Sequence, residues 1–346
     1  MSEVVTPAPA TNKAGFAKTD YSGGKSTLCI GCGHDSITSA IISAAYSSSI
    51  SPYDIAKMSG IGCSSKTPGY FINKASGFNS LHGRMAPVAT GAKVANQKLV
   101  TLGVSGDGDS AAIGLGGFVH LMRRNVQMAY LVANNGVYGL TKGQFSATSD
   151  KGAKAKSGDL NPFSTIDLCG LALEVGCTFV ARSFSGDAKQ LVTLISAALK
   201  HKGTALIDII SPCVTYNNHD GSTKSYDYFK SHKVMLQELG LIFPEQEITV
   251  DYDPGTTTQV DLPDGSKLTL KKLAHDHDVF DREKAMDLVY KSRMKGEILT
   301  GLFFIDEKSG NLADTLNLTE KSLALLNEKE TRPAESTLKE VFKEYR

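Results

Sequence analysis

Short apolar runs recur along the first two thirds of the chain and alternate with longer segments of helical character. Leu99–Ser105, Met128–Ala133 and Thr204–Ile210 are largely apolar, which is typical of strands buried on both faces of a parallel sheet. Ser110–Arg124 is small and apolar enough for a packed helix, and Ala188–His201 is amphipathic. This alternation predicts an α/β protein with a doubly wound, mostly parallel sheet.

The same pattern predicts further elements around these strands. Helices are expected at Asp35–Ala45, Ala89–Ala95 and Phe163–Gly176, and a strand at Thr178–Arg182. The stretch Ser146–Asn161 is rich in Lys, Gly and Ser, so we expect a mobile loop or one that a partner covers.

The pattern changes beyond about residue 235. A small hairpin, a short strand and two polar helices are expected there, at Glu247–Tyr252 with the turn Pro263-Asp-Gly265, at Gly301–Asp306, and at Asp276–Lys295 and Thr319–Tyr345. We therefore expect three parts: a flexible leader over residues 1–19, an α/β domain over 20–235, and a small α+β C-terminal extension over 236–346 that packs on a partner subunit.

Composition narrows the class of protein. The 346 residues are 41% hydrophobic, and 37 basic residues balance 36 acidic ones. This balance gives no electrostatic reason to expect nucleic acid or a membrane surface as a partner. No apolar stretch approaches the roughly 20 residues that span a bilayer, and the N-terminus is too polar for a signal peptide. We expect a cytoplasmic protein.

Two polar motifs follow the first two buried strands. Gly106-Asp107-Gly108-Asp109 follows one, and Asn134-Asn135-Gly136-Val137-Tyr138 follows the next. Parallel strands deliver such motifs to the same edge of a sheet. A hard cation that bridges phosphate oxygens takes a carboxylate, an amide oxygen and a backbone carbonyl. Glycines let the backbone approach the phosphates, which would sit at a helix N-terminus. The alternative is an ordinary turn and a strand-to-loop junction, since Asp-Gly pairs are common in turns.

The two motifs together resemble the diphosphate-binding motif of thiamine diphosphate enzymes. In those enzymes GDG and a later NN-x-x-Y hold one Mg²⁺ and one pyrophosphate. The resemblance implies that Asp107 and the Asn135 side chain bind Mg²⁺ and that Val137 offers its carbonyl.

The six cysteines suggest a second cofactor. Cys29 and Cys32 form a CxxC pair, Cys63 lies in a glycine-rich segment, and Cys213 follows a proline, an environment that suits an iron–sulfur cluster. Cys169 and Cys177 have apolar neighbours and are expected to be buried thiols. The CxxC pair alone would also fit a redox pair or half of a zinc site, although a zinc site needs a second close pair. A disulfide framework is not expected in so large a chain.

The motifs also resemble, in order, those of the β subunit of 2-oxoacid:ferredoxin oxidoreductases. The matching segments, within residues 20 to 230, are CIGCGH, GIGCSSK, LHGRMAPVATGAKVAN, GDGD, RRNVQMAYLVANNGVYGLTKGQ and SPCVTYN. The resemblance implies that Cys29, Cys32, Cys63 and Cys213 bind one [4Fe–4S] cluster.

The same resemblance assigns the remaining site residues. The residues expected to contact thiamine diphosphate are Gly33, His34, His82, Gly106, Asp107, Gly108, Asp109, Asn135, Val137, Tyr138, Gly139 and Leu140. His82 could otherwise be a surface loop histidine. Lys66 and Lys142 are cations that could meet a substrate carboxylate, the alternative being lysines that face solvent or a partner.

The implied activity is the oxidative decarboxylation of a 2-oxoacid to acyl-CoA and CO₂, with electrons passing through the cluster to ferredoxin. Run in reverse, the reaction would fix CO₂. The long tail and the motifs favour 2-oxoglutarate over pyruvate. An α subunit would supply the aminopyrimidine-binding domain, in a dimer of αβ heterodimers. The rival functions are a non-redox thiamine diphosphate decarboxylase or synthase subunit and a zinc-bearing or electron-transfer module.

Overall fold

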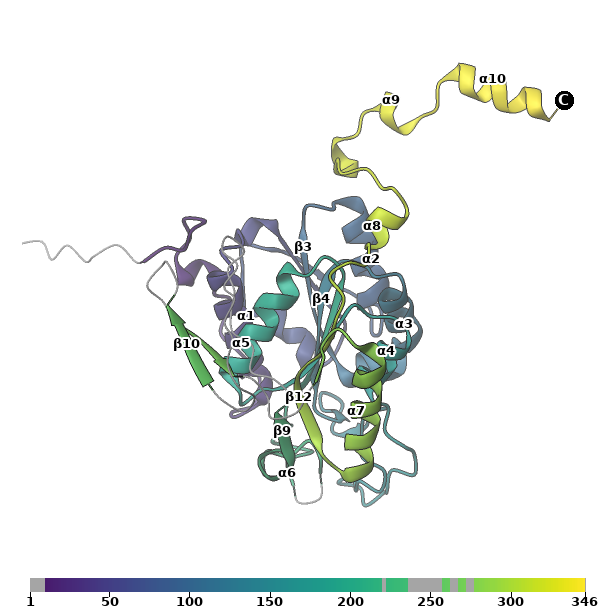
Figure 1. Cartoon of the computed structure of the whole chain (residues 1–346). Coiled ribbons are helices and arrows are strands. Elements are labelled where there is room, and N and C mark those ends of the chain that lie inside the picture. The colour runs from purple at the N-terminus through teal and green to yellow at the C-terminus, as the bar shows by residue number, and fades with distance from the viewer. Residues whose placement is uncertain (1–9, 220–221, 236–256, 262–266, 272–276, 346) are drawn as a thin grey trace, which may run out of the picture.

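The strands of the chain pair into one sheet with helices on both faces (Figure 1). The computed structural model describes residues 10–219, 222–235, 257–261, 267–271 and 277–345. Eight described strands form the sheet, in the spatial order β2 (Ser76–Asn79), β1 (Ile55–Ser59), β3 (Val100–Gly106), β4 (Met128–Asn134), β8 (Thr204–Ile210), β7 (Phe179–Phe184), β12 (Ile298–Ile305) and β9 (Lys233–Met235). Neighbours are parallel except β7 and β12. The predicted doubly wound, mostly parallel sheet is confirmed.

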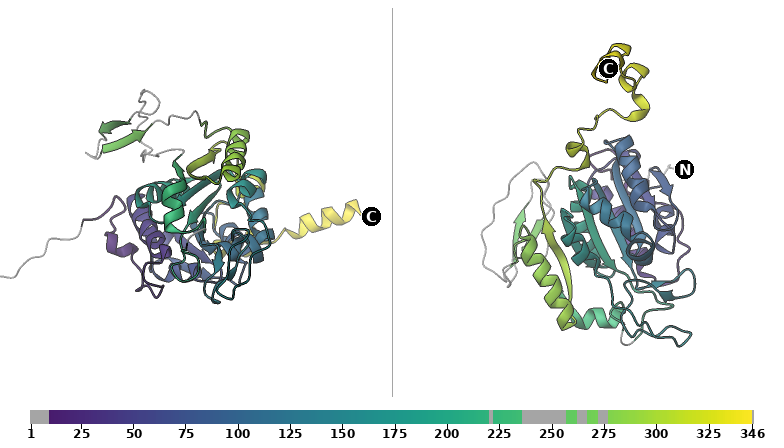
Figure 2. Two further views of the ribbon diagram at one scale, coloured as in Figure 1. Left: turned by 90° about the horizontal axis from the view of Figure 1, so that it is seen from below. Right: turned by 90° about the vertical axis from the view of Figure 1, so that its right-hand side faces the viewer.

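Two helical layers cover the sheet (Figures 1 and 2). One face carries α1 (Gly33–Ser47) and α5 (Ala188–Lys200), and the other carries α2 (Met85–Ala95), α3 (Leu115–Arg123), α4 (Leu168–Glu174) and α7 (Arg282–Lys295). Alternate side chains of β4 serve the two cores, with Tyr130 and Val132 in one and Leu131 and Ala133 in the other. Because both faces are covered, the central strands are apolar at nearly every position.

The C-terminal third contributes to this same sheet. The strand expected at Gly301–Asp306 is β12, which pairs with β7, while α7 packs on α4 and β12. The structure thus places residues of the expected 236–346 extension inside the central layers. β10 (Thr257–Asp261) and β11 (Lys267–Lys271) form the expected antiparallel hairpin. Its turn and residues 247–252 lie outside the described residues.

Both ends of the described chain differ from expectation. Within the expected flexible leader, Asn12 Nδ2 donates to Tyr21 Oη (2.8 Å) and to the Tyr46 carbonyl (2.9 Å), so residues 12–19 pack beside α1. The helix expected over Thr319–Tyr345 is broken into η5 (Leu323–Leu325), α9 (Glu328–Thr331) and α10 (Glu335–Glu344). Pro333 cannot continue a helix, which separates α9 from α10. With α8 (Leu312–Thr315) at its base, this arm projects from the body (Figures 1 and 2).

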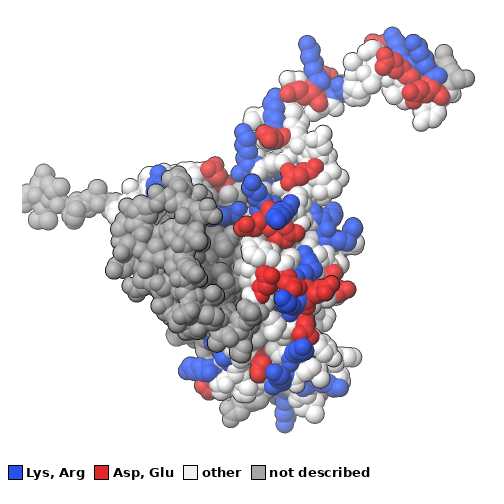
Figure 3. All heavy atoms as spheres, viewed as in Figure 1, with Lys and Arg blue, Asp and Glu red and all other residues white. Residues whose placement is uncertain are grey.

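The remaining described elements are short. They are η1 (Lys18–Tyr21), η2 (Pro52–Asp54), η3 (Ser64–Gly69), the π-helical turn η4 (Gly108–Ile113), β5 (Val137–Tyr138), β6 (Gln144–Phe145) and α6 (Tyr226–His232). Basic and acidic side chains are intermixed on the described part of the face in Figure 3. Within the described ranges, every helix is too short or too polar to cross a membrane.

Candidate cofactor-binding site

Four adjacent strands bring the sequence motifs to one edge of the sheet. β1, β3, β4 and β8 are consecutive and parallel, and their carboxyl ends lead into the segments that carry Cys63, Asp107, Asn135 and Cys213. Open α/β sheets bind ligands at this edge because the loops there converge. The order of the strands in space thus explains why motifs so distant in sequence meet.

A cavity of about 80 Å³ lies at this edge. All of the predicted thiamine diphosphate-contacting residues except Gly33 line it, together with Cys63, Ser64 and Thr141. Gly33 begins α1 directly beside His34, and a Cβ there would lie 2.5 Å from the Ser211 hydroxyl. Pockets that enclose a whole small ligand usually measure about 300–1,000 Å³. The described chain therefore forms only part of such an enclosure.

Asp107 is the buried carboxylate of this cavity, with 1% of its surface exposed. Its Oδ2 accepts hydrogen bonds from the Ser146 hydroxyl and from Thr148 Oγ1 (2.6 Å). Its Oδ1 accepts one longer bond, from the Asn135 N–H (3.3 Å). Burial raises the pKa of Asp107, and these hydrogen bonds partly oppose that rise. One carboxylate oxygen is thus saturated while the other keeps capacity for a cation.

Asn135 and Val137 complete a donor set for a hard cation. Both line the cavity with Asp107, and the Val137 N–H donates to Asn135 Oδ1 (3.0 Å). Asn217 Nδ2 donates a hydrogen bond to the Asn135 backbone carbonyl (2.8 Å). A carboxylate, an amide oxygen and a backbone carbonyl are ligands that suit Mg²⁺ bridging phosphates. These residues therefore fit the magnesium diphosphate that the motifs imply.

At two positions only glycine fits, because a side chain from another motif occupies the place of a Cβ atom. A Cβ at Gly108 would lie 2.3 Å from Cε1 of Tyr138, whose hydroxyl donates to the Gly108 carbonyl (3.1 Å). A Cβ at Gly60 would lie 1.9 Å from Asp109 Oδ2. Both distances are far below van der Waals contact. The motif glycines therefore permit close packing between loops as well as an approach to phosphate.

Asp109 joins three loops at the cavity. Its Oδ1 accepts from His82 Nδ1 (2.5 Å), the Gly83 N–H (2.6 Å) and the Ile61 N–H (3.3 Å). Its Oδ2 accepts from the Ser105 hydroxyl (2.6 Å). His82 is thereby fixed at the cavity rather than free on the surface. Both oxygens of Asp109 are occupied by protein donors, so it organises the loops.

His34 is a buried, neutral imidazole in the cavity wall. Its Nδ1 lies 2.7 Å from the Ser211 hydroxyl. Burial lowers the pKa of His34 to about 4. At neutral pH it therefore lacks a charge.

The four cysteines of the motifs meet beside this cavity. The position of a Cβ on Gly139 would be 3.6 Å from Cys63 Sγ and 3.7 Å from Cys213 Sγ. Burial raises the pKa of Cys32 to about 11, with smaller contributions from the neighbouring Cys213 and Cys63. Burial also raises the pKa of Cys63, and the neighbouring Cys213 and, more weakly, Cys29 add to this rise. Neighbouring thiols that face a residue without a side chain fit the ligand set of an iron–sulfur cluster.

The sulfur atoms of these four cysteines are spaced more widely than the ligands of a single metal ion. Among the described residues, no three His, Cys, Asp or Glu side chains are close enough to hold a single ion. The ligands of a [4Fe–4S] cluster are more widely spread, because each thiolate binds a different iron. The CxxC turn itself is formed by Gly31 at φ +80°, with the Cys32 N–H donating to the Cys29 carbonyl (3.0 Å).

The two other cysteines are buried as expected. Cys169 and Cys177 have no exposed surface, and burial raises the pKa of Cys177 to about 11. Neither thiol is among the residues that line the cavity.

Lys66 and Lys142 are exposed near the cavity but are not part of its lining. Lys66 lies in η3, directly after the Cys63 segment, and its charge lowers the pKa of Cys63 against the effect of burial. Lys142 follows Thr141, which does line the cavity, and has φ +81°. A non-glycine residue in this region costs backbone energy, so its position is imposed by the surrounding loop.

The segment Ser146–Asn161, expected as a mobile loop or one that a partner covers, contains site residues that sequence reasoning missed. Ser146, Thr148 and Ser149 are buried. The hydroxyls of Ser146 and Thr148 donate to Asp107, and that of Ser149 donates to the Gly136 carbonyl. Asn217 was also missed as a partner of Asn135. Sequence composition alone does not distinguish small polar residues of an exposed loop from those of a buried, hydrogen-bonded site. The one available signal was that Asn217 ends the SPCVTYN motif.

Comparison with known proteins agrees with this geometry. Residues 59–209 match the family described as "Thiamine pyrophosphate enzyme, C-terminal TPP binding domain". This range begins at the end of β1 and runs into β8, so it contains both diphosphate-binding motifs.

Similar full proteins narrow the family. The β subunit of a 2-oxoacid:ferredoxin oxidoreductase from Saccharolobus solfataricus is 45% identical over 57% of this chain. A "2-oxoglutarate synthase subunit KorB" from Methanothermobacter marburgensis is 36% identical over 63% of this chain and 78% of that protein. The chain belongs to the β subunits of 2-oxoacid:ferredoxin oxidoreductases. The match takes in 65% of the length of the Saccharolobus β subunit.

A solved structure extends the likeness to the C-terminal third. A chain of the 2-oxoglutarate:ferredoxin oxidoreductase from Magnetococcus marinus, solved with 2-oxoglutarate, coenzyme A and succinyl-CoA, is 29% identical. It superposes with a TM-score of 0.73 over 96% of both chains. This β-subunit fold is therefore shared well beyond the segment that the sequence comparisons cover.

Proposed function

We propose that this chain is the β subunit of a heteromeric enzyme that oxidises 2-oxoglutarate with CoA to succinyl-CoA and CO₂ and reduces ferredoxin. One observation carries the proposal: the cysteine segments and the diphosphate segments meet at one cavity, where Cys63 and Gly139 line the same wall as Asp107 and Asn135. A redox centre and a decarboxylation site would thus be neighbours.

Named residues would hold the two cofactors. Asp107, Asn135 and Val137 would bind the Mg²⁺ of thiamine diphosphate, and Cys29, Cys32, Cys63 and Cys213 would bind one [4Fe–4S] cluster. When bound, thiamine diphosphate supplies the carbanion chemistry of decarboxylation and the cluster accepts single electrons. The neutral His34 and His82, which Asp109 holds in place, line the same cavity and can donate or accept hydrogen bonds there.

An α subunit would complete the site. Two exposed apolar side chains, Ile61 (39%) and Leu140 (50%), line the cavity, and exposed Ile113 lies against Gly83. A neighbouring cavity of about 390 Å³ shares Tyr138 and includes the exposed Phe163. These surfaces support contact with a partner subunit. In the proposed enzyme that subunit would carry the aminopyrimidine-binding domain, and the assembly would be a cytoplasmic dimer of αβ heterodimers. The C-terminal arm would also pack on that partner.

Lys142 would bind the distal carboxylate of 2-oxoglutarate, and Lys66 would lie near the carboxylate of the 2-oxo acid group. We expect Lys142→Ala to raise the KM for 2-oxoglutarate about tenfold or more, since a charge-assisted contact contributes about 1.5–3 kcal/mol. Its effect on pyruvate, which lacks that carboxylate, should be within about twofold. Equal losses on both substrates would reject this role. Steady-state kinetics on the assembled αβ enzyme provide the measurement.

The function as a whole is tested by supplying the anaerobic αβ complex with CoA and a 2-oxoacid and following reduction of ferredoxin. Reduction with 2-oxoglutarate at a kcat/KM well above that for pyruvate is expected. Preference for pyruvate would overturn the substrate. Decarboxylation without any reduction of ferredoxin would instead favour a non-redox thiamine diphosphate enzyme.

A further inference from the structure

A buried hydrogen-bond chain runs from Asp107 across the sheet to the far side of the site. Thr148 Oγ1 lies 2.6 Å from Asp107 Oδ2 and 3.0 Å from Asn134 Oδ1. Asn134 Nδ2 donates to Asp208 Oδ1 (2.9 Å). These side chains are all at least 97% buried. The chain therefore lies in a part of the protein where hydrogen-bond geometry is strongly enforced.

The chain ends in an ion triad. Asp208 Oδ2 accepts from Arg182 Nε (2.9 Å), and Arg182 Nη2 donates to Asp167 Oδ1 (2.8 Å). Asp167 also accepts the N–H groups of Cys169 and Gly170, which fixes it at the start of α4. Asp208 and Arg182 are paired across β8 and β7. Each member is thus held from a different element of the scaffold.

The polarity of Asn134 follows from this anchoring. Because the Asp208 carboxylate can only accept, the Asn134 amide must turn its NH₂ toward Asp208 and its oxygen toward Thr148. The Thr148 hydroxyl has one hydrogen and two acceptors, the Asn134 oxygen and the Asp107 carboxylate. The hydrogen bond to the charged Asp107 (2.6 Å) is the stronger one, and the Asn134 oxygen (3.0 Å) is the weaker second acceptor of the same hydrogen.

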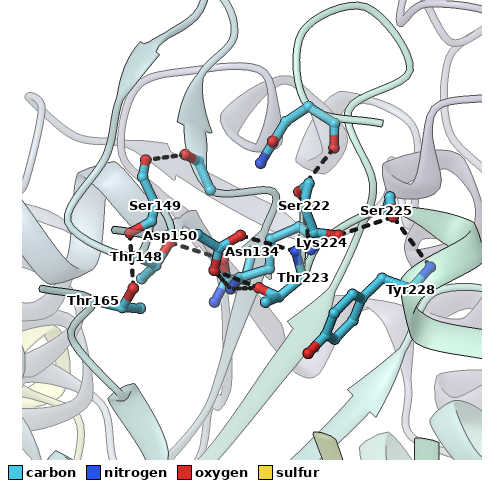
Figure 4. A network of polar contacts seen from close by, with 12 residues as sticks. Asn134, Thr148, Ser149, Asp150, Thr165, Ser222, Thr223, Lys224, Ser225 and Tyr228 are labelled. Atoms are coloured by element: carbon cyan, nitrogen blue, oxygen red, sulfur yellow. Dashed lines mark hydrogen bonds and ion pairs between the residues drawn. The ribbon is translucent and has the colours of Figure 1, made fainter. Parts of the chain in front are cut away.

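The loop that carries Thr148 is fastened on its other side (Figure 4). Asp150 accepts from the N–H and the hydroxyl of Thr223 (2.9 and 2.6 Å), and Thr165 Oγ1 donates to the Ser149 carbonyl (2.8 Å). Thr223 is thereby tied to the segment that binds Asp107. The position of Thr148 is therefore fixed by the Asp150–Thr223 contact and by the Thr165–Ser149 contact.

We propose that Thr148 is a positioning residue for the magnesium site: its hydroxyl, which lies between Asn134 Oδ1 and Asp107 Oδ2, occupies Asp107 Oδ2 together with the Ser146 hydroxyl and directs Oδ1 toward the cation. This inference rests on the proposed thiamine diphosphate function. Partners that orient a metal-binding carboxylate contribute strongly, and their loss typically weakens metal binding 10–100-fold.

The test is a calorimetric titration of Mg²⁺ into the αβ complex stripped of magnesium, at saturating thiamine diphosphate. Thr148→Val keeps the shape and removes the hydroxyl, and we expect it to raise the Mg²⁺ dissociation constant 10–100-fold. Thr148→Ser restores the hydroxyl and should remain within about threefold of wild type. Iron content, measured in parallel, should be equal in all variants and reports that the fold is intact.

Thr165→Val is the matched control. It removes the hydroxyl of a threonine that fastens the same loop but does not contact Asp107. Thr165 and Thr148 both line a cavity of about 150 Å³. Its Mg²⁺ affinity should match wild type. Wild-type affinity in Thr148→Val, or an equal loss in Thr148→Ser or Thr165→Val, would overturn the positioning role. Failure of the wild-type complex itself to bind Mg²⁺ with thiamine diphosphate would overturn the proposed function instead.

Discussion

Single contacts between the two diphosphate motifs explain why both must be present. Gly108 belongs to the first motif and Tyr138 to the second, and the tyrosine ring occupies the space that a side chain at position 108 would need. In the same way, Asp109 occupies the space that a side chain at position 60 would need, and it also forms a hydrogen bond with His82. The motif residues thus specify each other's positions as well as a ligand.

We expect Gly108→Ala to weaken binding of magnesium thiamine diphosphate about fivefold or more, because overpacking of this kind typically costs about 1–3 kcal/mol. Tyr138→Leu combined with Gly108→Ala should recover part of that loss by vacating the space. Gly116→Ala, in α3 with open space around its Cα, is the control and should bind normally. Calorimetry on the αβ complex measures all three. Additive losses in the double variant would contradict the steric account.

The sequence predicted the residues of the site better than their partners. Asp107, Asn135 and Cys63 line one cavity, as their motifs led us to expect, and metal binding by these residues and by the other cysteines stays a prediction. Ser146 and Thr148 could not be predicted, since hydroxyl residues in a Gly- and Lys-rich stretch are ordinary loop composition. Their burial depends on a carboxylate that lies about 40 residues earlier in the chain.

At the scale of elements, apolar runs predicted the strands that are covered on both faces. β1 was missed although it delivers Cys63, because Lys57 interrupts its apolar pattern. In the structure Lys57 is buried and its Nζ donates to the carbonyls of Pro68 (2.7 Å) and Phe71 (2.9 Å). A charged residue whose donors are satisfied within the fold cannot be told from a surface residue by pattern alone.

The end of α5 gives a prediction about pH. His201 caps this helix, and its Nε2 lies 2.7 Å from the Thr178 hydroxyl. Burial lowers the pKa of His201 to about 4, with Asp306 partly opposing the shift. Between pH 6.5 and 4 the unfolded chain therefore binds the proton more readily than the folded chain, so stability falls as pH falls through this window and is fully present above it.

His201→Gln keeps a donor for Thr178 without titrating. Between pH 7.5 and 5, we expect wild type to lose about 2 kcal/mol more unfolding free energy than this variant. Urea unfolding of the two chains at both pH values measures the difference. An equal loss in both would show that His201 does not titrate in this window.

At the scale of the whole molecule, the chain carries the cavity at the sheet edge and an arm that leaves the body (Figures 1 and 2). Leu338, Val341 and Phe342 on α10 and Tyr345 at its C-cap follow helical spacing, and all are exposed. The arm is attached at its base, where Gln97 Nε2 donates to the Thr319 carbonyl (2.7 Å). Such an apolar stripe is suited to a partner subunit.

Replacing Leu338 and Phe342 by Ala should weaken association with the α subunit about tenfold or more, since apolar anchors dominate interface energies. Glu340 and Lys343, on the same helix, give a matched control when both are changed to Ala. Thermal unfolding of the isolated chain should be unchanged in both variants. Sedimentation of the mixed subunits measures the affinity, and equal affinities in all three proteins would contradict a docking role for the arm.

The central claim is that an iron–sulfur cluster and thiamine diphosphate share this edge of the sheet. The most direct measurement is iron and acid-labile sulfide analysis of the anaerobic αβ complex, with its visible spectrum before and after 2-oxoglutarate and CoA. We predict four irons and four sulfides on Cys29, Cys32, Cys63 and Cys213, and bleaching of the cluster band on adding both substrates. A metal-free or zinc-loaded complex that still binds thiamine diphosphate would contradict the account.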